Sequence, residues 1–200
     1  MTLPAEATRN AALLRRGRGL EAATLAWNLV GIVILAVAAL RAHSVALAGF
    51  GLDSLIEIGA STVVLWELSG TGEERQRRAL RLIAAAFLAL AGYLTVQTIV
   101  VFATGYHPQH SPLGIVWTAI TAAAMFVLAA GKKRTGRRLA NRVLIAEGRV
   151  TVIDGVLALA VLVGLTLNAA LGWWWADPAA GLVIVYYALK EARAIYTRHD

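Results

Sequence analysis

The sequence GFGLDSLIEIGAS, residues 49–61, places two carboxylates, Asp53 and Glu57, in the middle of a long apolar run. Because the two are four positions apart, on a helix they lie one turn apart on the same face, roughly 6 Å along the axis. If this run lies in a lipid bilayer, each ionised carboxylate costs at least about 2.5 kcal/mol at the bilayer centre. Such a pair needs a compensating partner or a function, and the rest of the chain must supply it.

The composition is that of a polytopic membrane protein. Hydrophobic residues make up 58% of the 200 residues and charged residues only 16%, well below the charged share of an ordinary soluble domain. The absence of cysteine excludes disulfides and thiolate metal sites, so a metal would be held by oxygen or imidazole. The formal charge is +7, but the basic residues lie between apolar runs, which indicates membrane topology signals and no nucleic-acid partner.

Six apolar runs are long enough to cross about 30 Å of hydrocarbon. They lie at about 20–41, 45–68, 80–103, 112–131, 142–170 and 178–196. The connectors are short and carry helix breakers, among them Gly131, Gly172 and Asp177-Pro178. We therefore predict an all-α membrane protein with six transmembrane helices. Residues 1–19 are expected to form a basic cytoplasmic segment and residues 20–200 the membrane domain, with no C-terminal cytoplasmic domain.

The basic residues divide unevenly between the two sides of the predicted membrane domain. If both termini are cytoplasmic, the inner side collects nearly all of the lysines and arginines, and the outer side holds only Arg41. Since cytoplasmic loops carry the excess of Lys and Arg, the sequence predicts cytoplasmic N- and C-termini and a multi-pass protein of the cell membrane. Lys132 is counted with the inner charges, and Glu21, near a span end, is expected to be solvated or to snorkel to the interface.

The fifth span supplies two further carboxylates, Glu147 and Asp154, which are seven positions apart and so share a helix face. Counted inward from the span ends, Asp154 lies at about the depth of Asp53 and Glu57. Three carboxylates at one depth from two helices predict a site for a divalent cation, because oxygen ligands suit such ions. Protons would compete with the metal for these oxygens, which is the basis of metal/proton exchange.

Several residues have a second interpretation. The three carboxylates could form a buried polar network that only fixes helix packing, and Glu147 could line a cytoplasmic approach to the site. Asn28, at a similar depth on the first span, is either a packing residue or a group that supports the acids. His107 and His110, in a predicted outer loop, are interpreted as loop residues, with weak metal binding at the exit as the alternative. No nucleophile–base arrangement appears, so we expect neither enzymatic activity nor a resident cofactor.

Three segments carry a resemblance to a known family: SVALAGFGLDSL at 44–55, the stretch 146–154, and GWWWADPAA at 172–180. They resemble the transmembrane domain of the cation diffusion facilitator, or cation efflux, family, over nearly the whole chain from about residue 20. The resemblance implies a six-span exporter of divalent metals. It also implies a pair of metal ligands on the second span that faces a pair on the fifth. Metal would then move outward by alternating access, driven by the entry of protons.

Two positions depart from the pattern of that family. Glu57 stands where the family usually has Asp, and the first ligand of the fifth span falls on Val150, whose side chain cannot bind metal. The resemblance therefore implies three of the four ligands. The fourth position is left to water, Glu147, Asn28 or the hydroxyl of Thr151.

The function predicted from these features is secondary transport, in which a divalent metal is exported in exchange for protons. The sequence does not distinguish Zn²⁺, Mn²⁺, Fe²⁺, Co²⁺ and Cd²⁺. The alternative is a non-transporting membrane protein that senses metal or serves as a partner subunit, and proton-coupled transport of another substrate also stays open. A homodimer would have to form through the membrane helices.

Overall fold

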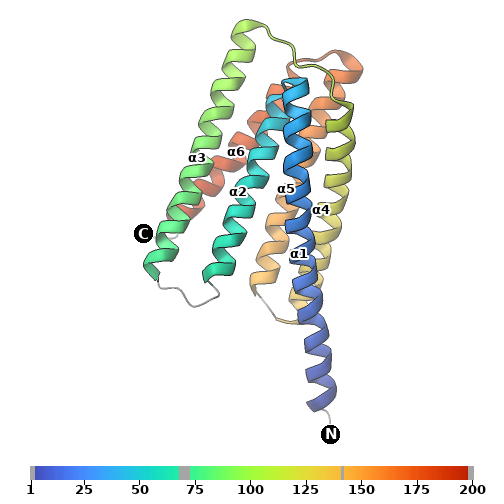
Figure 1. Ribbon diagram of the computed structural model, residues 1–200, viewed down its shortest axis with the longest axis vertical. Coiled ribbons are helices and arrows are strands. Elements are labelled where there is room, and N and C mark those ends of the chain that lie inside the picture. Colours follow the sequence, from blue (N-terminus) through green and yellow to red (C-terminus); the bar gives the residue numbers. More distant parts are fainter. Residues whose placement is uncertain (1–2, 68–72, 141, 198–200) are drawn as a thin grey trace.

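The computed structural model describes residues 3–67, 73–140 and 142–197, with side chains described at 10–59, 81, 84–140, 144–145 and 148–195. This part of the chain folds into helices joined by short connections (Figure 1). In chain order the helices are α1 (Leu3–Ala42), α2 (Val45–Glu67), α3 (Glu73–Thr104), α4 (Pro112–Arg138), α5 (Arg142–Leu171) and α6 (Ala176–Thr197).

The helices α1, α2, α5 and α4 form a ring. Helix α1 packs against α2 and α4, α4 packs along α5, and a more limited contact between α2 and α5 closes the ring. The helices α3 and α6 pack against each other and, through α2 and α5, onto the side of this ring. The connections 43–44, 105–111 and 172–175 lie at one end of the bundle, which we call the tryptophan end (Figure 1). The opposite end, where α1 begins and α4 finishes, is the basic end.

Local sequence decides where several helices begin and end. Helix α3 is followed by Gly105 and α5 by Gly172, with φ of 63° and 68°, a conformation that glycine adopts without steric cost. Helix α4 begins after Ser111, whose Oγ accepts a hydrogen bond from the N–H of Gly114 at 3.1 Å, and Pro112 occupies its first turn. Both features are typical of helix starts, because the first N–H groups of a helix lack partners within it.

Three helix boundaries differ from the predicted spans by seven residues or more, and one of them is the start of α3 at Glu73 in place of about 80. Helix α1 is continuous from Leu3 to Ala42, so the basic segment 1–19 is helical from Leu3 onward, in keeping with its content of alanine, leucine and arginine. The prediction that Gly131 ends the fourth span is wrong, because α4 continues to Arg138. A Cβ at Gly131 would lie 3.1 Å from Leu20. The glycine therefore allows α1 to approach α4 closely and does not break the helix.

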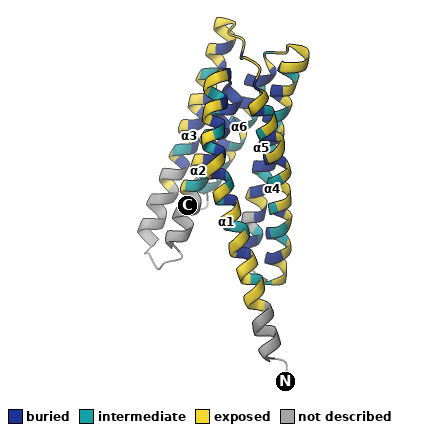
Figure 2. Ribbon diagram, turned by 45° about the vertical axis from the view of Figure 1, so that its right-hand side comes forward, coloured by how far each residue is buried: buried dark blue, intermediate teal, exposed yellow. Residues whose placement is uncertain are grey.

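The outer surface is apolar, as expected of a multi-pass membrane protein. Among the described residues, four helical segments are long and apolar enough to cross a membrane: Asn10–Ala42, Ala84–Thr104, Pro112–Arg138 and Gly148–Leu171. Large apolar side chains such as Leu40 and Val127 are more than 70% exposed, and Figure 2 shows exposed residues along the outward faces of the helices. The two other predicted spans coincide in position with α2 and α6.

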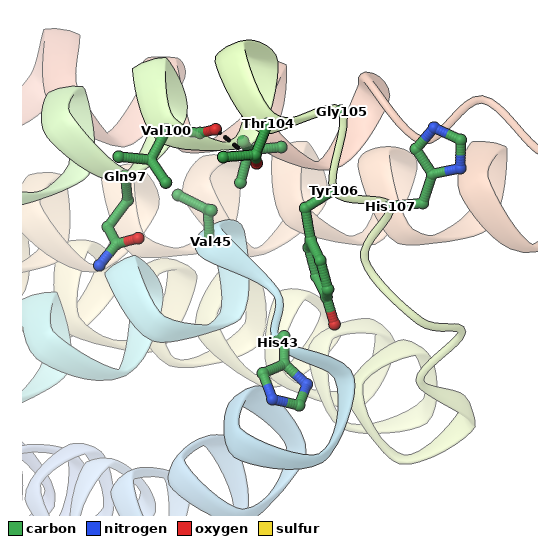
Figure 3. A pocket seen from close by; sticks show the side chains of 9 residues that line it. His43, Val45, Gln97, Val100, Thr104, Gly105, Tyr106 and His107 are labelled. Carbon is green, nitrogen blue, oxygen red and sulfur yellow. Dashed lines mark hydrogen bonds between the residues drawn. The ribbon is translucent and has the colours of Figure 1, made fainter.

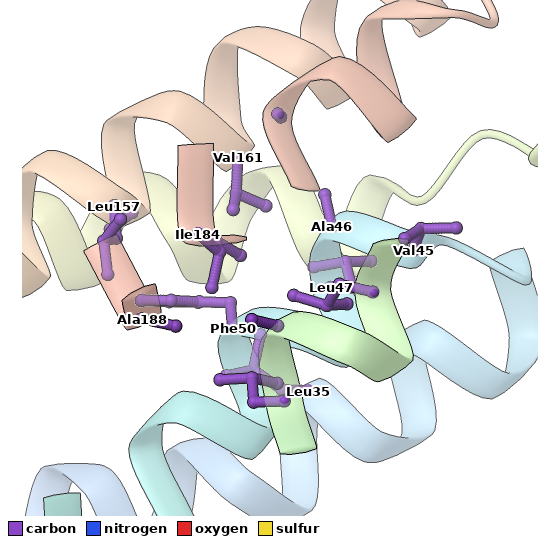
Figure 4. Packing of buried hydrophobic residues seen from close by; sticks show 14 of the residues in the cluster. Leu35, Val45, Ala46, Leu47, Phe50, Leu157, Val161, Ile184 and Ala188 are labelled. Carbon is purple, nitrogen blue, oxygen red and sulfur yellow. The ribbon is translucent and has the colours of Figure 1, made fainter. Parts of the chain in front are cut away.

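An apolar layer fills the bundle on the tryptophan-end side of the acidic residues (Figure 4). Its members are at most 3% exposed: Leu35, Leu47, Phe50, Leu157, Val161 and Ile184. Helix α2 runs away from the tryptophan end and α5 runs toward it, so the layer residues of α2 precede Asp53 and those of α5 follow Asp154. The acids are thus separated from the tryptophan end by packed apolar side chains.

Candidate metal centre

Asp53 and Glu57 of α2 meet Asp154 of α5 inside the bundle. One carboxylate oxygen from each of the three residues lies within 4.8 Å of the other two. Asp53 and Asp154 are each 6% exposed, and Glu57 is half-buried. Within the described part of the chain, these three side chains have ligand atoms close enough together to hold one metal ion. The structure therefore brings together the three residues named from the sequence, which we call the acidic triad.

Helix periodicity places Asp53 and Glu57 on one face of α2, and close packing of the helices brings Asp154 of α5 near them. At Gly155, next to Asp154, a Cβ would lie 3.0 Å from the ring of Phe126 in α4. At Gly51, a Cβ would lie 3.3 Å from Leu35 in α1. These glycines let the neighbouring helices pack closely at the level of the triad.

One oxygen of the triad lacks a protein partner. Oδ1 of Asp154 is buried and accepts no hydrogen bond within the described part of the protein. Burying an acceptor without a partner costs about 1–3 kcal/mol, and more for a charged group. A divalent cation would satisfy this oxygen and offset the repulsion among three carboxylates.

The spacing of the triad fits a small divalent ion. Carboxylate oxygens bind Zn²⁺ or Mg²⁺ at about 2.0–2.2 Å, so two oxygens on one ion are about 3.4 Å apart when the ion is tetrahedral and at most about 4.2 Å apart when it is octahedral. The upper limit of 4.8 Å among the triad oxygens exceeds the larger of these separations only slightly. All three oxygens could bind one ion if the carboxylates moved closer together.

Asn28 of α1 lies beside the triad. Its Nδ2 donates a hydrogen bond to Oε2 of Glu57 at 3.2 Å, and the residue is 7% exposed. The bond restricts how the Glu57 carboxylate can turn, so Asn28 acts as a positioning residue for this group. That Asn28 also binds the metal stays a prediction.

The described side chains do not identify a fourth ligand. Glu147 belongs to α5, but its side chain lies outside the described residues, so its proposed role stays a prediction. Val150 is 44% exposed and is not enclosed as Asp154 is. Thr151 is 2% exposed and has an interaction of its own. Water, Glu147, Asn28 and Thr151 all stay open as the fourth donor.

The outer histidines lie far from the triad, at the tryptophan end. His43 and His107 line an open pocket of about 700 Å³ together with Gln97 and Tyr106. His43 packs edge-on against Tyr106, whereas His107 stacks on Trp174 with ring centroids 4.8 Å apart. In Figure 3 the two imidazole rings do not face each other. These contacts favour the interpretation of His107 as a loop residue, and His43, between α1 and α2, likewise packs on an aromatic ring.

Asp177 has a structural role that the sequence did not reveal. It is fully buried, and it accepts hydrogen bonds from Oγ of Ser44 and from the N–H groups of Val45 at 3.0 Å and Ala46 at 3.5 Å. Ser44 in turn accepts from the N–H of Leu47 at 3.1 Å. Asp177 therefore joins the start of α6 to the start of α2, and so holds the helix that carries two of the triad carboxylates.

A buried ion pair that was not predicted joins α1 to α4. Nζ of Lys132 lies 2.9 Å from Oε2 of Glu21, and the two side chains are 1% and 35% exposed. Lys132 had been counted only as an inner-side charge, so its burial was not predicted, and Glu21, expected to be solvated or to snorkel, is half-buried and paired. Lys132 follows Met125 and Ala129 at helical spacing, and the structure buries all three on one face of α4. The assumed break at Gly131 hid this pattern.

Comparison with known proteins agrees with this architecture. The family model of the cation efflux transmembrane domain matches residues 80–197, more than half of the chain. The matched part includes Asp154 and stops short of the two carboxylates of α2. Transmembrane protein 163 of Xenopus laevis is 24% identical over 200 residues, which cover 90% of this chain and 70% of that protein. With a family match of this extent on a six-helix bundle, the chain belongs to the cation efflux family through its transmembrane domain.

Proposed function

We propose that this protein is a secondary transporter that exports a divalent metal cation in exchange for protons, with Asp53, Glu57 and Asp154 as metal ligands. The observation that carries the proposal is the acidic triad itself, in which three carboxylates from two helices converge within 4.8 Å and one buried oxygen has no described partner. Membership of the cation efflux family supports cation transport. No bond of a substrate needs to be made or broken, so we propose no enzymatic activity.

The proposed topology has six spans with the basic end in the cytoplasm. Arginines of α1 and α4 gather at this end, whereas Arg41 lies in the last turn of α1 at the tryptophan end. This asymmetry supports cytoplasmic termini and insertion in the cell membrane. The apolar layer separates the triad from the tryptophan end, so a cation would reach the triad from the basic end and leave after the helices rearrange.

Transport in proteoliposomes tests the proposal. The purified full chain is reconstituted with a pH-sensitive dye inside the vesicles, and Zn²⁺, Mn²⁺, Fe²⁺, Co²⁺ and Cd²⁺ are added in turn. We expect at least one metal to enter or leave together with an opposite proton flux. Asp53→Asn and Asp154→Asn should each reduce this flux to the background of empty vesicles, because each removes a charged ligand.

A matched control is Gln97→Ala, which removes a half-buried polar side chain from the tryptophan-end pocket and leaves the triad intact. This variant should transport as the unchanged protein does. Undiminished flux in Asp53→Asn would overturn the assignment of the site. Metal flux without any proton flux would overturn the exchange mechanism and leave the site in place.

One observation favours a second candidate function. The described side chains gather three ligands, not four, which suits a protein that binds metal as a sensor or partner subunit without transporting it. Metal binding measured by calorimetry, together with no flux for any of the five metals, would support this function. A homodimer packed through membrane helices is compatible with either function, and its presence is tested by the mass of the purified protein.

A further inference from the structure

The ion pair between Glu21 and Lys132 lies inside the helix ring near its basic end. Lys132 of α4 is 1% exposed although it carries a charge. A Cβ at Gly148 of α5 would lie 3.2 Å from the Cβ of Lys132, and Leu20 of α1 packs against Gly131. The lysine is thus enclosed by α1, α4 and α5, and its charge is compensated by Glu21 at 2.9 Å.

Stability alone does not explain this pair. Removing two charges from water costs several kcal/mol per ion, and apolar residues of similar size often stabilise a core as well or better. Oε1 of Glu21 is buried and has no hydrogen-bond partner in the described part of the chain, so the pair is incompletely satisfied. An incompletely satisfied pair in a membrane domain is more often retained for function.

The pair lies on the approach to the acidic triad. Glu21, Thr24 and Asn28 follow one another at helical spacing on α1, and Thr24 and Asn28 are both buried. Asn28 contacts Glu57 of the triad, and Glu21 lies about two turns, roughly 10 Å, nearer the basic end. We take this polar face of α1 as the route from the ion pair to the triad, since the apolar layer closes the other side.

We propose that the Glu21–Lys132 ion pair is an electrostatic gate on this route, which sets how fast a divalent cation reaches the acidic triad from the basic end. The inference rests on the proposed function of the triad. In the closed pair the two charges cancel. Without Glu21, the uncompensated ammonium of Lys132 repels an approaching cation; without Lys132, the carboxylate of Glu21 attracts it. Oε1 of Glu21 offers the incoming ion its first oxygen contact.

The gate is tested by the rate at which metal associates with the protein, which should shift in opposite directions when Glu21 and Lys132 are replaced. The full chain in detergent is mixed by stopped flow with Zn²⁺ or Mn²⁺ held by a fluorescent indicator, and metal uptake is followed. Charges that steer a ligand change association rates by about tenfold or more, so Glu21→Gln should slow uptake to that extent and Lys132→Gln should accelerate it. The neutral double variant E21Q/K132Q should return to within a few-fold of the original rate. Lys133→Gln is the matched control, since it removes the neighbouring, half-buried charge, and it should leave the rate unchanged.

The outcomes separate the gate from the site. Equal rates, or shifts in the same direction, in folded Glu21→Gln and Lys132→Gln would overturn the gate. If one of these variants fails to fold, the folded one decides alone, and an unchanged rate or a shift opposite to the expected one in that variant would overturn the gate. Asp53→Asn is measured in parallel. Unchanged metal binding in Asp53→Asn would show that the triad is not the metal site. If Asp53→Asn loses binding but Glu21→Gln and Lys132→Gln take up metal at the original rate, the site stands and only the gate is overturned.

Discussion

Nδ2 of Asn28 donates a hydrogen bond to Oε2 of Glu57 at 3.2 Å, which connects α1 to the acidic pair of α2. The same helix carries Glu21, whose carboxylate pairs with Lys132 of α4. Helix α1 therefore contacts both the acidic triad and the ion pair, although it supplies none of the three triad carboxylates. Its polar face links the two groups.

Replacing Asn28 by Ala should weaken metal binding while the fold persists. The loss of a group that orients a ligand typically costs about 10–100-fold in metal affinity, and the fold should persist because α1 also packs along α2 and α4. The dissociation constant is measured by calorimetry on the purified chain. Gln97→Ala, which removes an amide remote from the triad, is the control, and an unchanged affinity in Asn28→Ala would show that Glu57 needs no orientation.

Replacing Ser44 by Ala should destabilise the protein more than replacing Ser111 by Ala. Both serines cap a helix start, and loss of such a cap costs about 0.5–2 kcal/mol. Ser44 also donates to the buried carboxylate of Asp177, which would lose a partner at a further cost of about 1–3 kcal/mol. Thermal unfolding followed by circular dichroism in detergent measures the difference. Equal losses for the two variants would contradict the role assigned to Asp177.

Replacing Gly164 by Ala should separate α5 from α6. The added Cβ would lie 2.8 Å from the carbonyl oxygen of Ala176 and from Cβ of Ala180, and such overpacking costs about 1–3 kcal/mol. Gly92→Ala is the matched control, because its Cβ would meet nothing within 4 Å and alanine favours the helix by about 1 kcal/mol. We expect the melting temperature to fall for the first variant and to hold or rise for the second.

Metal should raise the melting temperature only when the triad is intact. A ligand that binds the folded state alone, present at 100 times its dissociation constant, stabilises that state by about 2.7 kcal/mol. The increase should vanish in Asp154→Asn. It should persist in Asp177→Asn even though the baseline stability falls, because Asp177 contacts the start of α2 and not the triad. Removal of metal by a chelator should lower the melting temperature without unfolding the bundle, since the apolar core does not depend on the ion.

Much of the candidate site could be predicted before the structure was known. The shared face of Asp53 and Glu57 follows from helix periodicity, and the matching depth of Asp154 follows from the constant rise per residue, counted from the ends of two spans. The burial of Lys132 could not be predicted in the same way. It depends on whether Gly131 ends a helix or seats Leu20 of α1, and the sequence pattern is compatible with both.

The sequence by itself determined that the chain is an apolar helical protein with a pair of acids on one helix and a third acid on another. These properties depend on composition, on the length of apolar runs and on local periodicity. Only the tertiary structure decided that Asn28 orients Glu57, that Asp177 holds the start of α2, and that Lys132 turns inward to Glu21. The physical reason is that helices in lipid choose their neighbours by close packing and by pairing of polar groups, and both depend on side chains that are distant along the chain.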